Sequence, residues 1–560
     1  MDIKEAILSN YKAKVFKSRK DHILDLASGQ SAISANSRAV PGIMTNRGCC
    51  YAGCKGVVVG PLKDACVITH GPIGCGFYSW GTRRNKARSD DYGRNFIQYC
   101  LSTDMQEPDI VFGGEKKLRQ AITEAVTLFK PEHIMICSTC PVGLIGDDIH
   151  AVASWAEKEF GVKCLAFSCE GYKGVSQSGG HHIANNGLMK KLIGSDDISP
   201  IGRFPVNLLG EYNIGGDGWE TERILKKIGY DVVCVFTGDS TAKAIEKSHR
   251  AHLNLVQCHR SINYVAEMMN KAFGIHWLKV NFVGLKATVK SLKDIAQFFG
   301  DSDLIARTDE VIEQELDAIK EEMDLLTERL NGRKAAIFVG GSRSHHYQEL
   351  LKDLGVETVL AGYEFAHRDD YEGRKVIGEI KEDADSKNIE SLIVEPDKRY
   401  KAILSEARYQ ELKETIDLEN YQGMIKDMEN GAFVVDDLNH YETIEFIRFL
   451  KPDVFFSGIK DKFVIQKAGV LSRQLHSYDY SGPYSGFNGA VIFGRDLLMG
   501  LKAPAWRMIT PPWAVNDPPN NPEAYRDLKA PEGSQALESR ESLANIKPIE
   551  SDLSSEAQHA

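Results

Sequence analysis

The chain has 560 residues, enough for about three to five domains at the usual size of about 100–200 residues each. Hydrophobic residues make up 42% and charged residues 26%, a composition typical of a soluble globular protein. Its 68 Lys and Arg against 78 Asp and Glu give a net charge of -10, which argues against a nucleic acid or an anionic membrane held by overall charge. No apolar signal segment and no run of ~18 apolar residues is present. We therefore expect a cytoplasmic protein without a membrane or nucleic-acid partner.

Short apolar or β-branched runs alternate with amphipathic segments along most of the chain. The runs predict strands at 65–69, 133–137, 163–168, 206–209, 231–236, 253–257, 335–339, 358–361, 432–435 and 453–457. The segments between them predict helices at 116–129, 148–160, 220–228, 263–273, 289–299, 309–330, 347–354 and 442–450. This alternation indicates an α/β fold, in which several doubly wound domains have parallel sheets covered by helices.

Unusual residues follow the predicted strands. Polar or glycine-rich clusters follow eight of them, and several include cysteine, histidine, arginine or lysine, for example at 69–75, 137–141 and 256–260. Ligands of open α/β sheets bind beyond the carboxyl ends of the strands. One large central site built by several domains would explain the pattern, and ordinary turn chemistry is the alternative.

The cysteines are the candidate metal ligands. All 12 lie in the first 258 residues, and a large chain of this kind is expected to keep them reduced. Cys137-x-x-Cys140 alone is a weak zinc or redox signal, because no second such pair follows. Cys49, Cys75 and Cys140 lie beside glycine or proline, which allow close approach of the backbone to an iron–sulfur cluster. Three thiolates are one short of the usual set, so a second chain would complete the cluster; a structural zinc site is the alternative.

Nucleotide-binding motifs are missing. The sequence has no G-x-x-x-x-G-K-[ST] motif and no complete G-x-G-x-x-G motif. We therefore expect no nucleotide on this chain.

Several segments together resemble one protein family. The chain is similar, from about residue 38 to 513, to the α subunits of nitrogenase component I, most closely the molybdenum–iron type in a clostridial-like branch with a long insertion. The matching segments are 47–56, 70–75, 140–148, 169–185, 362–367 and 476–484.

The resemblance implies a fold and a domain plan. It implies three Rossmann-like doubly wound domains with a cofactor buried between them. The expected domains are 1–204 with the P-cluster cysteines, 205–334 with Cys258, and 335–513 with His476 and an insertion near 372–421, followed by a polar tail at 514–560. The charged insertion is expected to be an excursion on the surface.

The resemblance also implies metal ligands. Cys49, Cys75 and Cys140 match thiolates of the P-cluster, an 8Fe-7S cluster shared with the β chain. Cys258 matches the thiolate on the terminal iron of the iron–molybdenum cofactor, and His476 the imidazole on its molybdenum. Two ligands hold a large cluster poorly by themselves, so the surrounding groups must contribute.

The same resemblance assigns roles to the residues around the cofactor. The groups that would surround the cofactor are Arg83, Arg343, Gly340 and Gly341, and those that would lie at the homocitrate are Gln177, Lys460 and Asp461. His181 would donate a hydrogen bond and help deliver protons, and Ser261 would bond near the Cys258 sulfur. Access to the cofactor would be restricted by Val57 and Phe365. The chain departs from many relatives at Asp461 (Glu), Tyr478 (Trp), Gln257 (His) and Trp80 (Arg), which leaves the hydrogen bonding around homocitrate open.

The implied function is that of the catalytic α subunit of dinitrogenase in an α2β2 heterotetramer. It would reduce N2 to ammonia, with H2 evolution, using electrons that originate from reduced ferredoxin or flavodoxin. A homodimeric iron protein carrying ATP and a 4Fe-4S cluster would deliver them. A vanadium–iron or iron-only α chain is the main alternative, followed by a non-catalytic cofactor-maturation scaffold.

Overall fold

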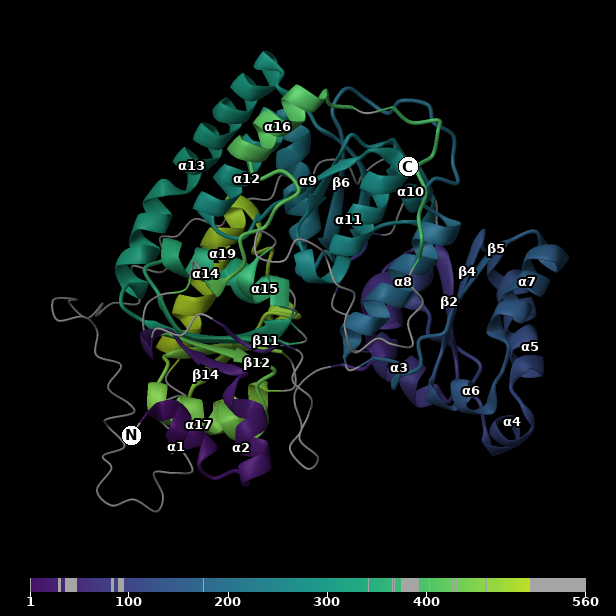
Figure 1. The fold of residues 1–560 in the computed structure, drawn as a ribbon, viewed down its shortest axis with the longest axis horizontal. Helices are drawn as coiled ribbons and strands as arrows, with labels where there is room; N and C mark the ends of the chain where they lie inside the picture. Colours follow the sequence, from purple (N-terminus) through teal and green to yellow (C-terminus); the bar gives the residue numbers. More distant parts are fainter. Residues whose placement is uncertain are drawn as a thin grey trace, which may run out of the picture.

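The computed structural model describes residues 2–28, 32–35, 48–81, 85–88, 95–174, 176–340, 342–364, 366, 368–373, 392–401, 403–425, 428, 432–458 and 461–503. In these residues the chain builds three sheets, each with its own helices (Figure 1). Apart from one edge strand all pairings are parallel, which confirms the expected α/β class. In the described part of the chain no helix has the length and apolar character needed to cross a bilayer.

The first sheet has the order β3-β2-β4-β5. Its strands are β2 (Ala65–His70), β3 (Leu101–Ser102), β4 (His133–Ser138) and β5 (Lys163–Phe167). Helices cover both faces, as parallel sheets require. On β4, Ile134 and Ile136 face the core that contains α5, whereas Met135 and Cys137 face the core that contains α8. The helices are η2 (Ala52–Val59, a π-type helix), α3 (Ile73–Gly81), α4 (Glu107–Phe112), α5 (Glu115–Phe129), α6 (Cys140–Ile145), α7 (Ile149–Phe160) and α8 (Gln177–Lys191).

The second sheet has the order β7-β6-β8-β9. Its strands are β6 (Pro205–Glu211), β7 (Asp231–Thr237), β8 (Leu253–Val256) and β9 (His276–Lys279). Its helices are α9 (Asp217–Ile228), α10 (Ala242–Lys247), α11 (His259–Phe273), α12 (Leu285–Phe299) and α13 (Ser302–Leu330). Leu188 of α8 and Val265 of α11 belong to one buried apolar core, which therefore joins the first two sheets.

The third sheet has the order β1-β12-β11-β10-β13-β14. Its strands are β1 (Ile23–Asp25), β10 (Lys334–Gly340), β11 (Glu357–Glu364), β12 (Phe433–Asp436), β13 (Val454–Ser457) and β14 (Leu471–Gln474). Its helices are α1 (Ile3–Leu8), α2 (Ala13–Lys20), α14 (Arg343–Asp353), α15 (Arg368–Glu372), α17 (His440–Leu450), α18 (Lys462–Lys467) and α19 (Gly486–Lys502).

The N-terminal segment lies on the third sheet, not on the first. β1 pairs antiparallel with β12, and the purple α1 and α2 lie beside α17 in Figure 1. Arg19 anchors the segment through a bidentate, fully buried ion pair to Glu442, with nitrogen–oxygen distances of 2.8 and 2.7 Å. The expected domain 1–204 includes this segment, because local patterns do not show which distant sheet a short strand joins. The division of the chain into domains otherwise stays a prediction.

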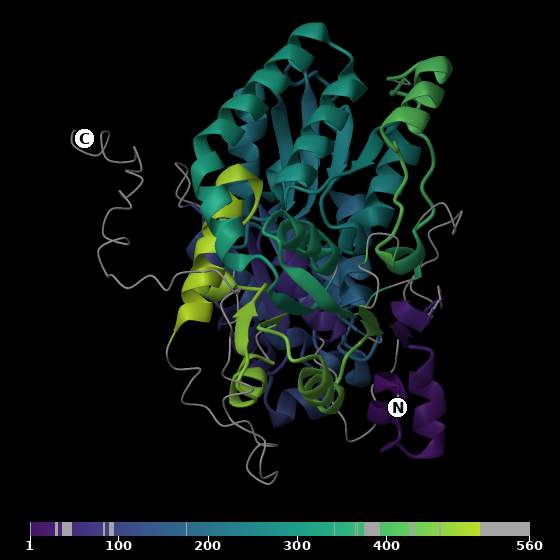
Figure 2. The same cartoon turned by 90° about the vertical axis from the view of Figure 1, so that its left-hand side faces the viewer.

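The insertion is not only a surface excursion. Its residues 374–391 lie outside the described part of the chain, but α16 (Glu406–Thr415), light green at the upper right of Figure 2, is tied to α12. Arg408 donates to the carbonyl of Gln297 at 2.5 Å. Leu412 and Leu418 are fully buried in the apolar core that the second and third sheets share. The apolar positions between the charges therefore decided how this segment folds. The predicted tail at 514–560 is outside the described residues.

Candidate metal centres

Cys49, Cys75 and Cys140 lie at one edge of the first sheet. Cys75 follows β2 in α3, Cys140 follows β4 as the first residue of α6, and Cys49 precedes η2. All three residues are exposed. Burial of part of its side chain and the nearby Cys49 and Cys140 raise the pKa of Cys75. The carboxyl ends of adjacent parallel strands thus bring these thiols together.

Gly171 leaves room for two of these sulfurs. A Cβ added at Gly171 would lie 3.1 Å from Sγ of Cys140 and 3.4 Å from Sγ of Cys49. The residue follows β5, so a third strand end contributes to the group. A glycine, which has no side chain, allows a metal cluster to approach the backbone closely. The arrangement therefore fits a metal cluster held at the surface by these thiols.

We expect Gly171→Ala to weaken metal binding at these thiols. The added methyl group would crowd Cys140 and Cys49 while their sulfurs are fixed by metal, and changes just outside a metal's ligands cost about 10–100-fold in affinity or activity. Iron content and cluster spectra of the purified protein measure the effect. Gly81→Ala is the matched control, because a Cβ there meets nothing within 4 Å. Equal iron in both variants would contradict the assignment.

Cys258 lies at the edge of the second sheet. It caps the N-terminus of α11 directly after β8. The backbone of Gly210, whose φ is +77°, lies so close to Cys258 that a Cβ added at Gly210 would be 2.7 Å from the Cys258 nitrogen. Ser261 donates to the carbonyl oxygen of Cys258 at 3.3 Å and accepts from Tyr212 at 2.8 Å. Ser261 therefore holds the Cys258 backbone, and its expected bond near the sulfur stays a prediction.

His476 lies at the edge of the third sheet, just after β14. A Cβ added at Gly458, which follows β13, would lie 3.0 Å from Nδ1 of His476 and 3.4 Å from Oε1 of Glu364 at the end of β11. Again a glycine lets backbone approach a candidate ligand. Three strand ends of this sheet meet at His476.

Arg343 forms a buried chain of hydrogen bonds that the sequence did not reveal. Its guanidinium donates to the Tyr478 hydroxyl at 2.5 Å and to the Leu475 carbonyl at 3.3 Å, and Tyr478 donates to Asp217. Burial opposes the charge of Arg343, but Tyr478, Asp217 and Glu211 raise its pKa, so it stays a cation. Tyr478, the residue that departs from many relatives, thus orients the predicted cofactor-cradling arginine. Gly340, also predicted there, ends the neighbouring β10.

Asp461 has a protein partner. It is buried and forms an ion pair with Nε2 of His440 at 3.3 Å. The hydrogen bond to Asp461 raises the pKa of His440. Its predicted place beside homocitrate stays a prediction.

Helix α8 connects the surface thiols with Cys258. At its start, the Oε1 of Gln177 lies 2.5 Å from where a Cβ of Gly48 would be. Two turns later Asn185 donates to the Ser261 carbonyl at 3.0 Å. Between them His181 is buried, and burial together with the charge of Arg260 lowers its pKa to about 3. His181 is therefore a neutral imidazole at neutral pH, suited to donate one hydrogen bond.

Other predicted residues are less constrained or not described. Val57 of η2 is partly buried against the core of the first two sheets. Four predicted positions lie outside the described residues: Arg83, Gly341, Phe365 and Lys460.

The family model described as "Nitrogenase component 1 type Oxidoreductase" matches residues 49–502. The chain belongs to the nitrogenase component 1 family. Among relatives it is 54% identical to the nitrogenase molybdenum-iron protein alpha chain of Clostridium pasteurianum, over 91% of this chain and 97% of the relative. It is 52% identical to that of Methanosarcina barkeri, over 90% and 95% of the two chains. The structure titled "Nitrogenase Cp1 at pH 6.5" superposes with a TM-score of 0.88 at 54% identity, over 91% of this chain and 100% of the other.

Membership of the nitrogenase component 1 family confirms the resemblance expected from the sequence motifs. The chain is a nitrogenase-type oxidoreductase, and its fold is that of a nitrogenase molybdenum–iron protein. The family implies metal cofactors, a β chain and an iron protein.

Proposed function

We propose that this chain is the catalytic α subunit of a molybdenum dinitrogenase, which reduces N2 to ammonia with H2 evolution. The observation that carries the proposal is the placement of Cys258 and His476 just after the ends of β8 and β14, with α8 leading from the surface thiols to Cys258, in a chain 54% identical to a molybdenum–iron protein alpha chain. The iron–molybdenum cofactor with homocitrate would supply the multi-electron reduction chemistry when bound. The chain itself would hold, orient and enclose it.

The surface thiols support a P-cluster shared with a β chain. Among the described residues, one group of three or more potential ligands has all its ligand atoms within 4.8 Å of one another, and that group does not include Cys49, Cys75 or Cys140. The sulfurs of these three residues are therefore spaced more widely than the ligands of a single ion. Large apolar side chains are exposed on the same loops and helices, including Tyr78 (70%) and Leu144 (77%). Exposed apolar side chains beside half of a ligand set indicate a subunit interface. The β chain would cover them and complete the 8Fe-7S cluster.

Partly buried cations support an anionic cofactor near Cys258. Besides Arg343, Lys279 at the end of β9 is partly buried and donates to Nε2 of His346 at 2.8 Å. Burial lowers its pKa to about 8, while the Cys258 thiol and Asp370 act in the opposite direction. Burying an anionic cluster requires such positive charges and donors. Arg83, Gly341, Phe365, Lys460, Gln177 and Asp461 would complete the pocket.

Electrons would come from a partner that hydrolyses ATP. This chain has no P-loop, so hydrolysis would take place on the homodimeric iron protein with its 4Fe-4S cluster. Electrons would enter at the P-cluster thiols and continue along α8 toward Cys258 and His476.

The test is formation of labelled ammonia from 15N2 by the purified α/β protein with ATP and dithionite, with and without the iron protein. We expect ammonia only when the iron protein is present, and a rate that falls with added salt because surface charges steer transient encounters. A maturation scaffold would give none in either case. ATP hydrolysis or acetylene reduction without the iron protein would contradict the division of labour.

A further inference from the structure

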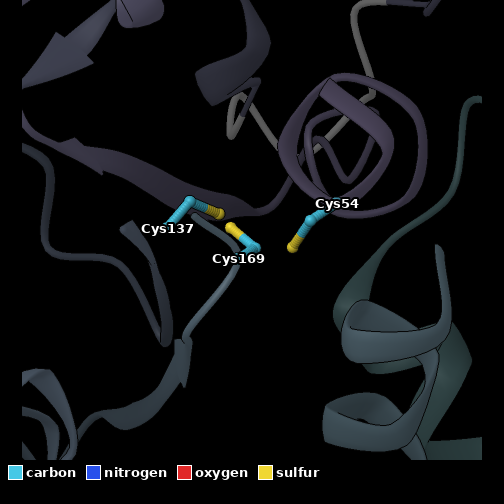
Figure 3. Close-up of side chains that lie close together, drawn as sticks. All are labelled: Cys54, Cys137 and Cys169. Carbon is cyan, nitrogen blue, oxygen red and sulfur yellow. The ribbon is translucent and has the colours of Figure 1, made fainter. Parts of the chain in front are cut away.

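Three buried cysteines form a separate sulfur cluster, which we call the inner thiol group: Cys54, Cys137 and Cys169. Their Sγ atoms all lie within 4.8 Å of one another, and each residue is fully buried. Figure 3 shows the sulfurs of Cys137 and Cys169 directed toward each other, with Cys54 on the other side of Cys169. They come from η2, from β4 and from the loop after β5, so the fold brings together residues far apart in the sequence.

The inner thiol group is distinct from the surface thiols. Cys137 and Cys140 look like one motif in the sequence, but Cys137 is buried within β4 and Cys140 is exposed at the start of α6. The two sulfurs belong to different groups. The inner thiols take no part in the proposed reaction.

The surroundings of the group are apolar. Met135, Leu165 and Leu188 belong to the same buried core as the three cysteines. Cys169 donates to the Ser138 carbonyl at a sulfur–oxygen distance of 3.5 Å. Although burial raises the pKa of Cys137, hydrogen bonds from Cys169 and Cys54 and the charge of Lys55 lower it to about 5. Burial raises the pKa of Cys54 and Cys169, so without a bound cation Cys137 is the thiol of the group that carries negative charge.

We propose that the inner thiol group binds one soft closed-shell cation, of which Cu(I) is the type, in a three-coordinate sulfur site. Thiolates select soft cations, and no carboxylate or imidazole among the described residues joins the group as a fourth ligand. Zinc in structural sites prefers four ligands. Binding displaces the thiol protons into solvent and involves no change of oxidation state.

The dimensions of the group allow this. The centre of an equilateral triangle with 4.8 Å sides lies about 2.8 Å from each corner, close to a metal–thiolate bond of about 2.3 Å. Small rotations of the three side chains would close the difference. Lys55 would offset part of the negative charge of the bound complex.

The test is an anaerobic titration of the purified holoprotein with Cu(I), buffered by a competing Cu(I) chelator, with iron measured in the same samples. We expect copper equimolar with the α chain, unchanged iron, and X-ray absorption that reports three sulfur neighbours. Cys54→Ser and Cys137→Ser should each weaken copper binding by at least about tenfold. Cys66→Ser is the matched control, because Cys66 is fully buried but in another core.

Three outcomes would overturn the proposal: no copper held against the chelator, equal copper in the wild type and both serine variants, or nitrogen and oxygen neighbours in the absorption spectrum. The spectrum of the wild type decides the matter if a variant fails to fold. Because copper and iron are measured separately, failure here leaves the proposed function unaffected.

Discussion

Replacing His476 or Cys258 with alanine is expected to abolish nitrogen reduction while leaving the P-cluster intact. Each residue is a proposed ligand at an opposite end of the cofactor, and the second and third sheets hold them independently. Since changes to outer groups alone cost about 10–100-fold, we expect the loss of a ligand to cost at least about 100-fold in ammonia formation. Paramagnetic resonance at low temperature should show the cofactor signal lost and the P-cluster signals retained.

The controls for this pair are His252→Ala and Cys234→Ala. Both replace the same residue types in the second sheet and its loops, away from the proposed cofactor. They should keep the cofactor signal and activity. A normal cofactor signal in His476→Ala and Cys258→Ala would refute the ligand assignment.

Cys75→Ala is expected to damage both the P-cluster and the assembly of α with β. Cys75 lies among exposed apolar residues of α3, such as Ile73 and Phe77, which the β chain is proposed to cover. Metal ligands contribute their binding free energy directly to the folded assembly, so losing one should release the β chain as well as iron. Size-exclusion chromatography and iron analysis of the same fractions measure both effects.

Cys100→Ala is the matched control, because Cys100 is a partly exposed cysteine of the same sheet that precedes β3, whereas Cys75 follows the carboxyl end of β2. It should leave assembly and iron unchanged. Isolation of a stable, fully metallated α monomer would contradict the shared cluster.

The regular elements could largely be predicted from the sequence. All ten predicted strands and eight predicted helices are present, because buried parallel strands are continuous apolar runs and helices carry a periodic apolar face. The strands that were missed, β1, β3, β9 and β14, have two to four residues, too few to show a period. Helices begin earlier than predicted, as α13 does at Ser302, because their first turns are polar.

The site was predicted less completely, for a physical reason. Motifs mark residues that lie next to one another in sequence, and so they indicated Cys49, Cys75, Cys140, Cys258 and His476. The hydrogen-bonded chain from Arg343 through Tyr478 to Asp217 joins residues from separate segments. The inner thiol group does the same. No local pattern records such contacts, which arise only when distant segments of the chain fold together.

The most direct test of the proposed function is the metal content of the anaerobically purified α/β protein. We expect molybdenum equimolar with the α chain, accompanied by iron in large excess and by no vanadium. Vanadium in place of molybdenum, or iron alone, would contradict the assignment of a molybdenum cofactor between Cys258 and His476.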